Sequence, residues 1–301
     1  MPIKAVLSIV VLVVCCSFTN LTAAQAPTAS PPVPQASPSL SPTPVTKTRT
    51  LEHEFVKNIA RDQKAIWTSP FRIKADDVPW VAGFAATTAA LIATDRHTSA
   101  WVSQNGSLSP VSRYVSWGGT AYADAGIAGA FYFIGRATDN DRARETGLLS
   151  AEAFIDSGIV AQVLKYAADR PRPNFDNGRG TFFNGGVSFP SGHATSAWSV
   201  ATVIAYEYWD HPAIRYGAFA AAAMVAMSRY SGRNHFLSDV FVGSAIGFYT
   251  GRYVYHAHHV DPSAPGGDSA LLKKTTKLIP AILPLYDRRS MTYGGKLAWS
   301  F

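Results

Sequence analysis

Residues 189–208 read FPSGHATSAWSVATVIAYEY, a short loop that passes into a strongly apolar run. The composition of this run favours a helix, and Pro190 suits a position in its first turn. Ser188 or Ser191 can cap the helix, while Gly192 lets an anion approach backbone amides that have no partner within the helix. The stretch therefore predicts an anion-binding helix start.

His193 stands next to that helix start and can give or take a proton near neutral pH. Considered singly, these few residues are equally typical of an ordinary capped helix. A functional interpretation therefore depends on what the rest of the chain adds.

Five further apolar segments have the length and the Ala, Val, Ile and Phe content of helices. The five segments, which add to residues 193–208, are 78–94, 121–135, 148–168, 213–229 and 237–256. A more polar helix is expected over 51–67. Strand-like alternation is confined to 277–286 and 291–301, which flank a charged turn. We expect an all-α fold, a helical bundle, with a small C-terminal β-hairpin as the one β element.

The N-terminal residues have the pattern of an export signal, with Lys4, an apolar run and small residues before a cleavage point after Ala24. An uncleaved membrane anchor is the alternative, although the run is short for a span. The next segment is rich in Pro, Ser and Thr, as in extended linkers. We expect a signal peptide, a linker, a helical domain and a tail at 1–24, 25–50, 51–260 and 261–301.

The formal charge of +7 suits an anionic substrate or the surface of the cell envelope. The basic residues are scattered, without a basic helix or an interleaved aromatic stripe, which argues against nucleic acid as a partner. Both cysteines, Cys15 and Cys16, lie in the expected signal. The exported chain, in the periplasm or cell envelope, would then have no disulfide, thiol nucleophile or cysteine-ligated metal.

The lengths of the uncharged apolar runs decide between a soluble domain and helices that lie in lipid. The longest strongly apolar run without charge, 78–94, is at the lower limit for a span, and the helix from 148 carries Glu152 and Asp156. We expect a soluble domain, with an integral protein of the cytoplasmic membrane as the alternative.

Two cations precede the loop before residue 190. Lys165 and Arg172 are seven positions apart, nearly two helical turns, and Pro171 and Pro173 stop the helix. The two cations would meet at a helix end. Alone, this pattern is equally typical of a basic C-terminus that complements the helix dipole.

A third stretch, residues 228–239, reads SRYSGRNHFLSD. If one helix includes both His235 and Asp239, they share a face. The carboxylate can then accept the proton of one ring nitrogen while the other stays basic. This would make an oriented nucleophile. Alone, such a pair is more typical of a surface, and Arg229 of a solvated helix end.

Together, three cations, an anion-binding helix start and two histidines predict phosphoryl transfer. In this order they resemble the signature of the type-2 phosphatidic acid phosphatase and vanadium haloperoxidase superfamily, whose members are helical bundles. The resemblance covers residues 148–256. It rests on Lys165, Arg172, Pro173, Pro190, Ser191, Gly192, His193, Arg229, His235 and Asp239.

The resemblance implies that His235 attacks phosphorus and forms a phosphohistidine while Asp239 orients its ring. His193 would protonate the leaving oxygen and then activate water. The phosphate oxygens would be held, without a metal or other cofactor, by Lys165, Arg172, Arg229 and the amides of Ser191 and Gly192. Arg170, which also precedes a proline, would lie behind the site or face solvent.

We therefore expect a metal-independent phosphatase acting on a phosphomonoester or on a lipid-linked phosphate or pyrophosphate. The partner would be a phosphate-ester or phospholipid-type substrate, with association at the membrane surface; the sequence predicts no oligomeric state. The alternatives are a haloperoxidase that binds vanadate as cofactor, with His235 as its axial ligand, and a membrane-embedded lipid phosphatase. Otherwise vanadate would bind only as a phosphate mimic.

Three histidines lie near the end of the last helix, at 256, 258 and 259, and such a group is found in metal sites. Only His256 and His259 share a helical face, and no paired acid lies near them in the sequence. We expect an ordinary helix end there, without a metal.

Overall fold

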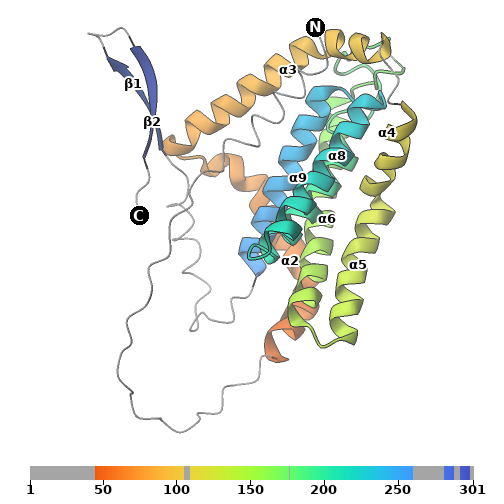
Figure 1. Cartoon of the computed structure of the whole chain (residues 1–301), viewed down its shortest axis with the longest axis vertical. Coiled ribbons are helices and arrows are strands. Elements are labelled where there is room, and N and C mark those ends of the chain that lie inside the picture. Colours follow the sequence, from red (N-terminus) through yellow and green to blue (C-terminus); the bar gives the residue numbers. More distant parts are fainter. Residues whose placement is uncertain (1–44, 105–108, 176, 260–280, 288–291, 299–301) are drawn as a thin grey trace. The chain divides into compact units, whose positions relative to one another are not determined.

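The computed structural model describes residues 45–104, 109–175, 177–259, 281–287 and 292–298 (Figure 1). These residues form α2 (Val45–Thr68), α3 (Val78–Gln104), α4 (Ser109–Ser116), α5 (Ala121–Ala137), α6 (Asp141–Ala168), α7 (Gly192–Glu207), α8 (Pro212–Ser231) and α9 (Leu237–His258). Three short 3-10 helices join them, η1 (Ser69–Arg72), η2 (Ala75–Asp77) and η3 (Trp117–Gly119). The expected all-α bundle is confirmed.

Each apolar segment is helical, but some helices extend beyond the expected limits. α6 begins at Asp141, well before residue 148, because the side chain of Asn140 caps it by accepting a hydrogen bond from the amide of Ala143. α2 begins at Val45, inside the segment assigned to the linker. The expected signal peptide lies outside the described residues.

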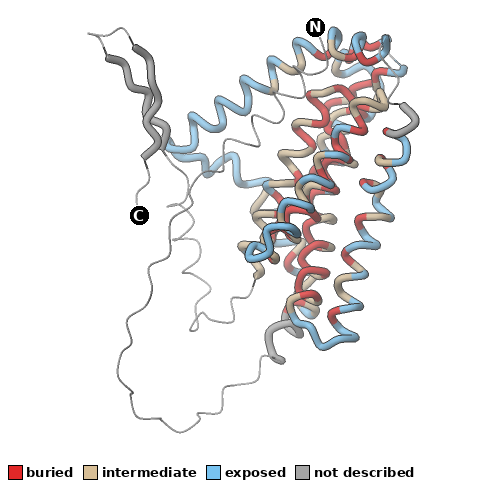
Figure 2. Tube along the Cα trace, viewed as in Figure 1, coloured by how far each residue is buried: buried red, intermediate tan, exposed pale blue. Residues whose placement is uncertain are grey.

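The core lies where α6, α7 and α9 pack together (Figure 2). Leu149, Ala153, Val203 and Val254 form a fully buried cluster between these three helices. A second cluster, Ala197, Ala201, Ala222 and Val225, joins α7 to α8. The helix that begins at Gly192 is therefore held by its neighbours on two sides.

Glycines let α9 approach α7 closely. A Cβ atom at Gly243, Gly247 or Gly251 would lie 2.6, 2.2 or 2.5 Å from a backbone oxygen of the segment 191–199. No side chain larger than hydrogen fits at these distances. The close approach aligns the starts of the two helices, and the amide of Ser191 donates to the carbonyl oxygen of Asp239 at 2.9 Å.

α3 exposes apolar side chains. Val78 and Trp80 are 52% and 56% exposed. Two helical segments among the described residues are long and apolar enough to cross a membrane, Ala75–Gln104 and Asp141–Ala168. Half of the second is buried inside the bundle, whereas the apolar window of the first has no buried residue. This exposed surface favours the membrane alternative over the expected soluble domain.

The expected C-terminal hairpin is present, with shorter strands, and its first strand includes Asp287, which was assigned to the turn. β1 (Ala281–Asp287) pairs with β2 (Thr292–Ala298) in antiparallel register, with Ala281 opposite Ala298 and Asp287 opposite Thr292. The remaining residues of the expected tail lie outside the described part of the chain.

Candidate active site

The fold brings the three sequence blocks together at one end of the bundle. The last turn of α6 carries Lys165, and a Cβ atom built on Gly192, at the start of α7, would lie 3.6 Å from the Cε atom of this lysine. The third block occupies the turn from α8 into α9. Its Arg229 lines the same cavity as His193. Helix ends from distant parts of the chain therefore meet at one site.

His235 lies in the turn before α9 and is 2% exposed. Its Nδ1 donates to the carbonyl oxygen of Ser188 at 2.8 Å. Because a carbonyl can only accept, this contact places the ring proton on Nδ1 and leaves Nε2 with a free lone pair. Burial lowers the pKa of His235 to about 4, so the ring is uncharged near neutral pH.

The relation of His235 to Asp239 differs from the expected one. α9 begins at Leu237, so the histidine lies outside the helix, and Nδ1 is 3.6 Å from Oδ2 of Asp239. This distance is too long for a hydrogen bond. The prediction that the carboxylate accepts the ring proton is therefore wrong in its detail. The Ser188 carbonyl accepts that proton, and Asp239 acts on the ring through charge.

Asp239 is itself held by several donors. Its Oδ2 accepts from the amide of Phe236 at 2.9 Å and from the hydroxyl of Ser188 at 2.5 Å. Its Oδ1 accepts from Arg170 at 2.6 Å. Burial alone would raise the pKa of Asp239, but its contacts with His235 and the charge of Arg170 hold that pKa below its ordinary value.

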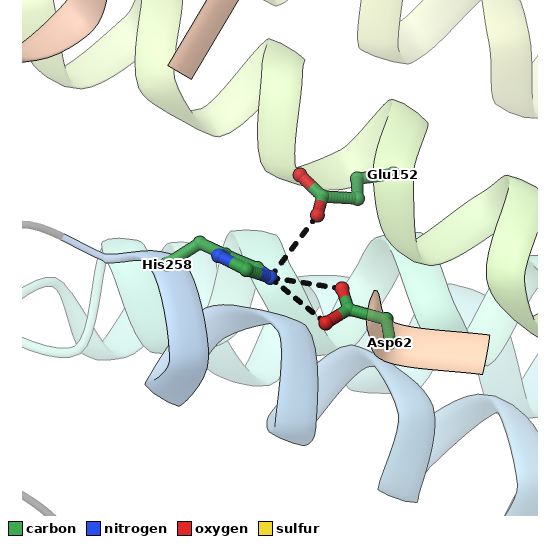
Figure 3. Close-up of side chains that lie close together, drawn as sticks. All are labelled: Asp62, Glu152 and His258. Atoms are coloured by element: carbon green, nitrogen blue, oxygen red, sulfur yellow. Dashed lines mark hydrogen bonds and ion pairs between the residues drawn. The ribbon is translucent and has the colours of Figure 1, made fainter. Parts of the chain in front are cut away.

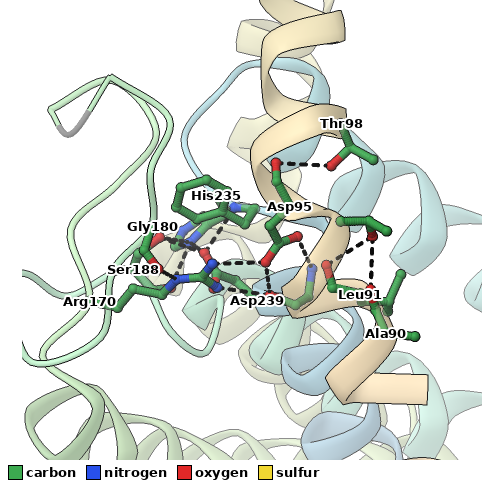
Figure 4. A network of polar contacts seen from close by, with 12 residues as sticks. Ala90, Leu91, Asp95, Thr98, Arg170, Gly180, Ser188, His235 and Asp239 are labelled. Atoms are coloured by element: carbon green, nitrogen blue, oxygen red, sulfur yellow. Dashed lines mark hydrogen bonds and ion pairs between the residues drawn. The ribbon is translucent and has the colours of Figure 1, made fainter. Parts of the chain in front are cut away.

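Arg170 is the residue of the site to which the sequence assigned no role (Figure 4). It is 1% exposed, and the alternative that it lies behind the site is confirmed. Besides Asp239, it pairs with Asp95 of α3 at 2.8 Å and donates to the carbonyl of Gly180 at 2.9 Å. The guanidinium also lies over the ring of Phe236, 4.1 Å from its centroid.

Asp95 was not among the residues picked from the sequence, although a lone carboxylate near the end of an apolar run is a signal that could have found it. It accepts from the amide and the hydroxyl of Ser238, so α3 is joined to the first turn of α9. Gly180 is also required, because its φ is +64° and a Cβ atom would lie 2.6 Å from Arg170.

His193 is uncharged in the free protein. Burial, and then the positive charge of Arg229, lower the pKa of His193 to about 3. Burial and the charge of Arg172 lower the pKa of Arg229 to about 10, which leaves it protonated near neutral pH. In the described residues, the buried Nε atoms of Arg172 and Arg229 have no hydrogen-bond partner. Such donors are what an anion needs.

The predicted role of Ser191 changes from its amide to its hydroxyl. The amide is occupied by the carbonyl of Asp239, so it is not available to an anion. The hydroxyl is fully buried and has no hydrogen-bond partner within the described part of the chain. Gly192 and His193 follow in the first turn of α7, where amides have no intrahelical partner.

A cavity of about 600 Å³ opens beside His193 and Arg229. Its rim includes the exposed aromatic residues Trp117 and Tyr122. Most of the lining comes from the segment around η3 and from the turn before α9. The loop expected to surround the substrate contributes Asn174.

Known proteins are similar in sequence to the part of the chain that carries the three blocks. Residues 146–262 match the family model of the PAP2 superfamily. The lipid A 1-phosphatase of Porphyromonas gingivalis is 30% identical over 147 residues, 46% of this chain and 31% of that protein. The lipid A 1-phosphatase of Rhizobium etli is 34% identical over 100 residues, 31% of this chain and 42% of that protein. The chain thus spans less than half the length of these curated relatives.

Two solved structures are also similar. A transmembrane PAP2-type phosphatidylglycerolphosphate phosphatase from Bacillus subtilis has a TM-score of 0.41 and 24% identity over 69% of this chain and 94% of that one. LpxE from Aquifex aeolicus has a TM-score of 0.36 and 22% identity over 49% of this chain and 84% of that one. The family match itself includes all three blocks of the site. The resemblance predicted from the three blocks is confirmed over residues 146–262, which match the PAP2 superfamily.

Proposed function

We propose that this protein is a phosphatase that hydrolyses a lipid-linked phosphate through a phosphohistidine at His235. The observation that carries the proposal is the buried, uncharged imidazole of His235. Its Nδ1 proton is engaged by the Ser188 carbonyl, and its neighbours are the cationic side chains of the site. An imidazole in this state has a nucleophilic Nε2.

In the first step, Nε2 of His235 bonds to phosphorus as the bond from phosphorus to the leaving oxygen breaks. His193 gives that oxygen a proton. Because His193 is uncharged in the free protein, it must gain this proton when the substrate binds, and the negative phosphate beside it raises its pKa. Lys165, Arg172 and Arg229 offset the charge on the transferred group.

In the second step, His193 removes a proton from water, the water oxygen bonds to phosphorus, and the bond between phosphorus and Nε2 breaks. The electron pair of the broken bond returns to Nε2, His193 releases its proton to solvent as phosphate leaves, and both histidines return to their starting states. The cations and the Ser191 hydroxyl supply the electrostatic stabilisation, so this scheme requires no metal.

Three observations favour a lipid-linked substrate over a soluble phosphomonoester. The curated relatives named above are lipid A 1-phosphatases. The rim of the cavity presents the exposed rings of Trp117 and Tyr122, which can contact an apolar chain. α3 exposes an apolar surface suited to lipid.

The covalent step is tested with a radiolabelled phospholipid or lipid A phosphate and rapid acid-free quenching. We expect the wild type to carry label on histidine and His235→Ala to carry none, with a rate at least about 10³-fold lower. His193→Ala should still accept label from a substrate with an activated leaving group but turn over about 10²–10⁴-fold more slowly.

Labelled His235→Ala would contradict the proposed nucleophile. A panel that compares these lipids with soluble phosphomonoesters at matched concentration tests the substrate class, and faster hydrolysis of the soluble esters would refute it. Vanadate should inhibit as a phosphate mimic. Peroxide-dependent bromination in its presence, without phosphatase activity, would instead indicate a haloperoxidase.

A further inference from the structure

A cluster of acidic side chains and a histidine lies at the end of α9 away from His235 (Figure 3). It consists of Asp62 from α2, Glu152 from α6 and His258 from α9. No paired acid lies near these histidines in the sequence, and α9 ends at His258 as expected, but the fold brings two acids to this helix end. The acids come from helices that are distant in the chain, so no local spacing could reveal them.

Three carboxylate oxygens surround one ring nitrogen. Nε2 of His258 lies 2.8 and 3.0 Å from the two oxygens of Asp62 and 3.2 Å from Oε1 of Glu152. Because this nitrogen holds at most one proton, it cannot donate fully to all three oxygens. Oε1 of Glu152 makes no hydrogen bond within the described residues.

A further carboxylate adds to the buried negative charge. Asp156 is fully buried one turn beyond Glu152, and the charges of Asp62 and His258 act on it. Its Oδ1 accepts from Gln63 at 2.8 Å, while Oδ2 has no partner within the described part of the chain. If all three were ionised, three carboxylates would face one imidazole in a water-poor place. Such an arrangement is costly unless a cation compensates it.

We propose that Asp62, Glu152 and His258 bind a divalent transition-metal ion of the Zn²⁺ or Mn²⁺ type. Imidazole nitrogen and carboxylate oxygen are ligands that these ions prefer. Two ligand atoms each about 2.1 Å from one ion lie about 3.0–3.4 Å apart, close to the distances observed here. The hydroxyl of Tyr253 donates to Asp62 at 3.1 Å and orients it from behind.

The ion would have a structural role. Its ligands come from three helices, so it would clip α2 onto α6 and α9. His258 is nineteen residues beyond Asp239 on the same helix, which corresponds to about 29 Å. The ion is therefore too distant to contact the phosphate of the proposed reaction.

The neighbouring His259 supplies an internal comparison. Its Nδ1 lies 3.0 Å from Glu145 and 3.3 Å from Glu207. The ring of His259 is more exposed than that of His258, and these two contacts are the ones its Nδ1 makes to carboxylates of the described residues. We assign the ion to the His258 cluster, and the two adjacent histidines can be tested separately.

The test uses the full chain, treated with a chelator and then titrated with Zn²⁺ or Mn²⁺. We expect one bound ion per chain by elemental analysis. At a hundredfold excess over Kd, the melting temperature should rise by about 5–10 °C. Co²⁺ in place of the ion should give visible absorption bands typical of mixed nitrogen and oxygen ligands, a measurement that needs no variant.

The near-isosteric variants Asp62→Asn, Glu152→Gln and His258→Asn should each bind the ion at least about 10-fold more weakly. His256→Asn, on the same helix end but outside the cluster, should bind it like the wild type. The chelated chain should keep its phosphatase rate below its melting temperature.

Three results would overturn the proposal. The first is a wild-type chain that binds no ion and does not change its melting temperature, which would indicate a cluster that shares protons instead. The second is loss of the ion from His259→Asn but not from His258→Asn. The third is loss of the phosphatase rate in a chelated chain that remains folded.

Discussion

At the scale of single residues, the site depends on a buried cation that does not contact the cavity. Arg170 lies between the carboxylates of Asp95 and Asp239, and all three are almost completely buried. Removal of one member of such a network leaves the others charged and unpaired. Arg170 therefore fixes Asp239, and through it the surroundings of the His235 ring.

Arg170→Ala should lower kcat by about 10²-fold and destabilise the fold by about 3–5 kcal/mol. The acid limb of the pH profile should also shift, because Asp239 loses the charge that balances it. Measurements are steady-state kinetics at several pH values and thermal unfolding. Arg179→Ala, which changes an exposed arginine of the same loop, is the control. If Arg170→Ala is less stable but keeps the kcat and the pH profile of the wild type, Arg170 only supports the fold.

In the proposed reaction, the pKa of His235 predicts the acid limb of the pH profile of kcat/KM. His235 must be unprotonated to attack, and burial lowers its pKa to about 4 in the free protein. The rate should therefore fall only as the pH drops through about 4, not through the 6.5 of an exposed histidine. Initial rates at low substrate concentration measure this. An acid limb near 6.5 would contradict the buried state of His235.

At the scale of the elements, the spacing of α7 and α9 determines the site. Gly243, Gly247 and Gly251 lie on one face of α9 and leave no room for a Cβ atom. Separation of the two helices would break the hydrogen bond from Ser191 to Asp239. The start of α7, which is proposed to bind the anion, and the helix that carries Asp239 would then move apart.

Gly247→Ala should destabilise the protein by about 1–3 kcal/mol, because its Cβ atom would lie 2.2 Å from the carbonyl oxygen of Thr195. Gly217→Ala in α8 is the matched control, since its Cβ atom would meet no atom within 4 Å. It should stabilise the helix by about 0.5–1 kcal/mol. Chemical denaturation of both variants gives the comparison, and equal stability would exclude the tight contact.

The sequence predicted the helices and the three blocks, because apolar composition and the chemistry of Lys165, His193 and His235 are local properties. It did not predict which atoms meet. The carbonyl of Ser188 replaces Asp239 as the acceptor for His235, and the amide of Ser191 is already occupied. Both partners are set by packing between distant segments, which no local pattern reports. The acids around His258 were missed for the same reason.

At the scale of the whole molecule, the exposed apolar surface of α3 stands out among the described helices. Its apolar window has no buried residue among those described, although the second half of the helix carries the buried Asp95. The later part of α3 is therefore fixed at the candidate site, while the apolar window before it has no buried residue within the described part of the chain. A bilayer would cover them.

Ala86→Lys, in the exposed part of α3, should weaken membrane attachment, because a lysine in a lipid-facing helix costs about 3 kcal/mol. Ala60→Lys, at an exposed alanine of α2, should not change it. The fraction of each variant that stays in the membrane pellet after carbonate extraction measures the effect. Release of the wild type into the supernatant would contradict the assignment of α3 to lipid.

The ion pair between Asp95 and Arg170 connects the position of α3 to the candidate active site. The same helix that would rest in the bilayer holds, through Arg170, the carboxylate of Asp239 beside the proposed nucleophile. A tilt or withdrawal of α3 would first change the contacts among Asp95, Arg170 and Asp239. We then expect the proposed phosphatase activity to depend on membrane attachment, with a higher rate when α3 lies in lipid and a lower rate when the protein is released from it.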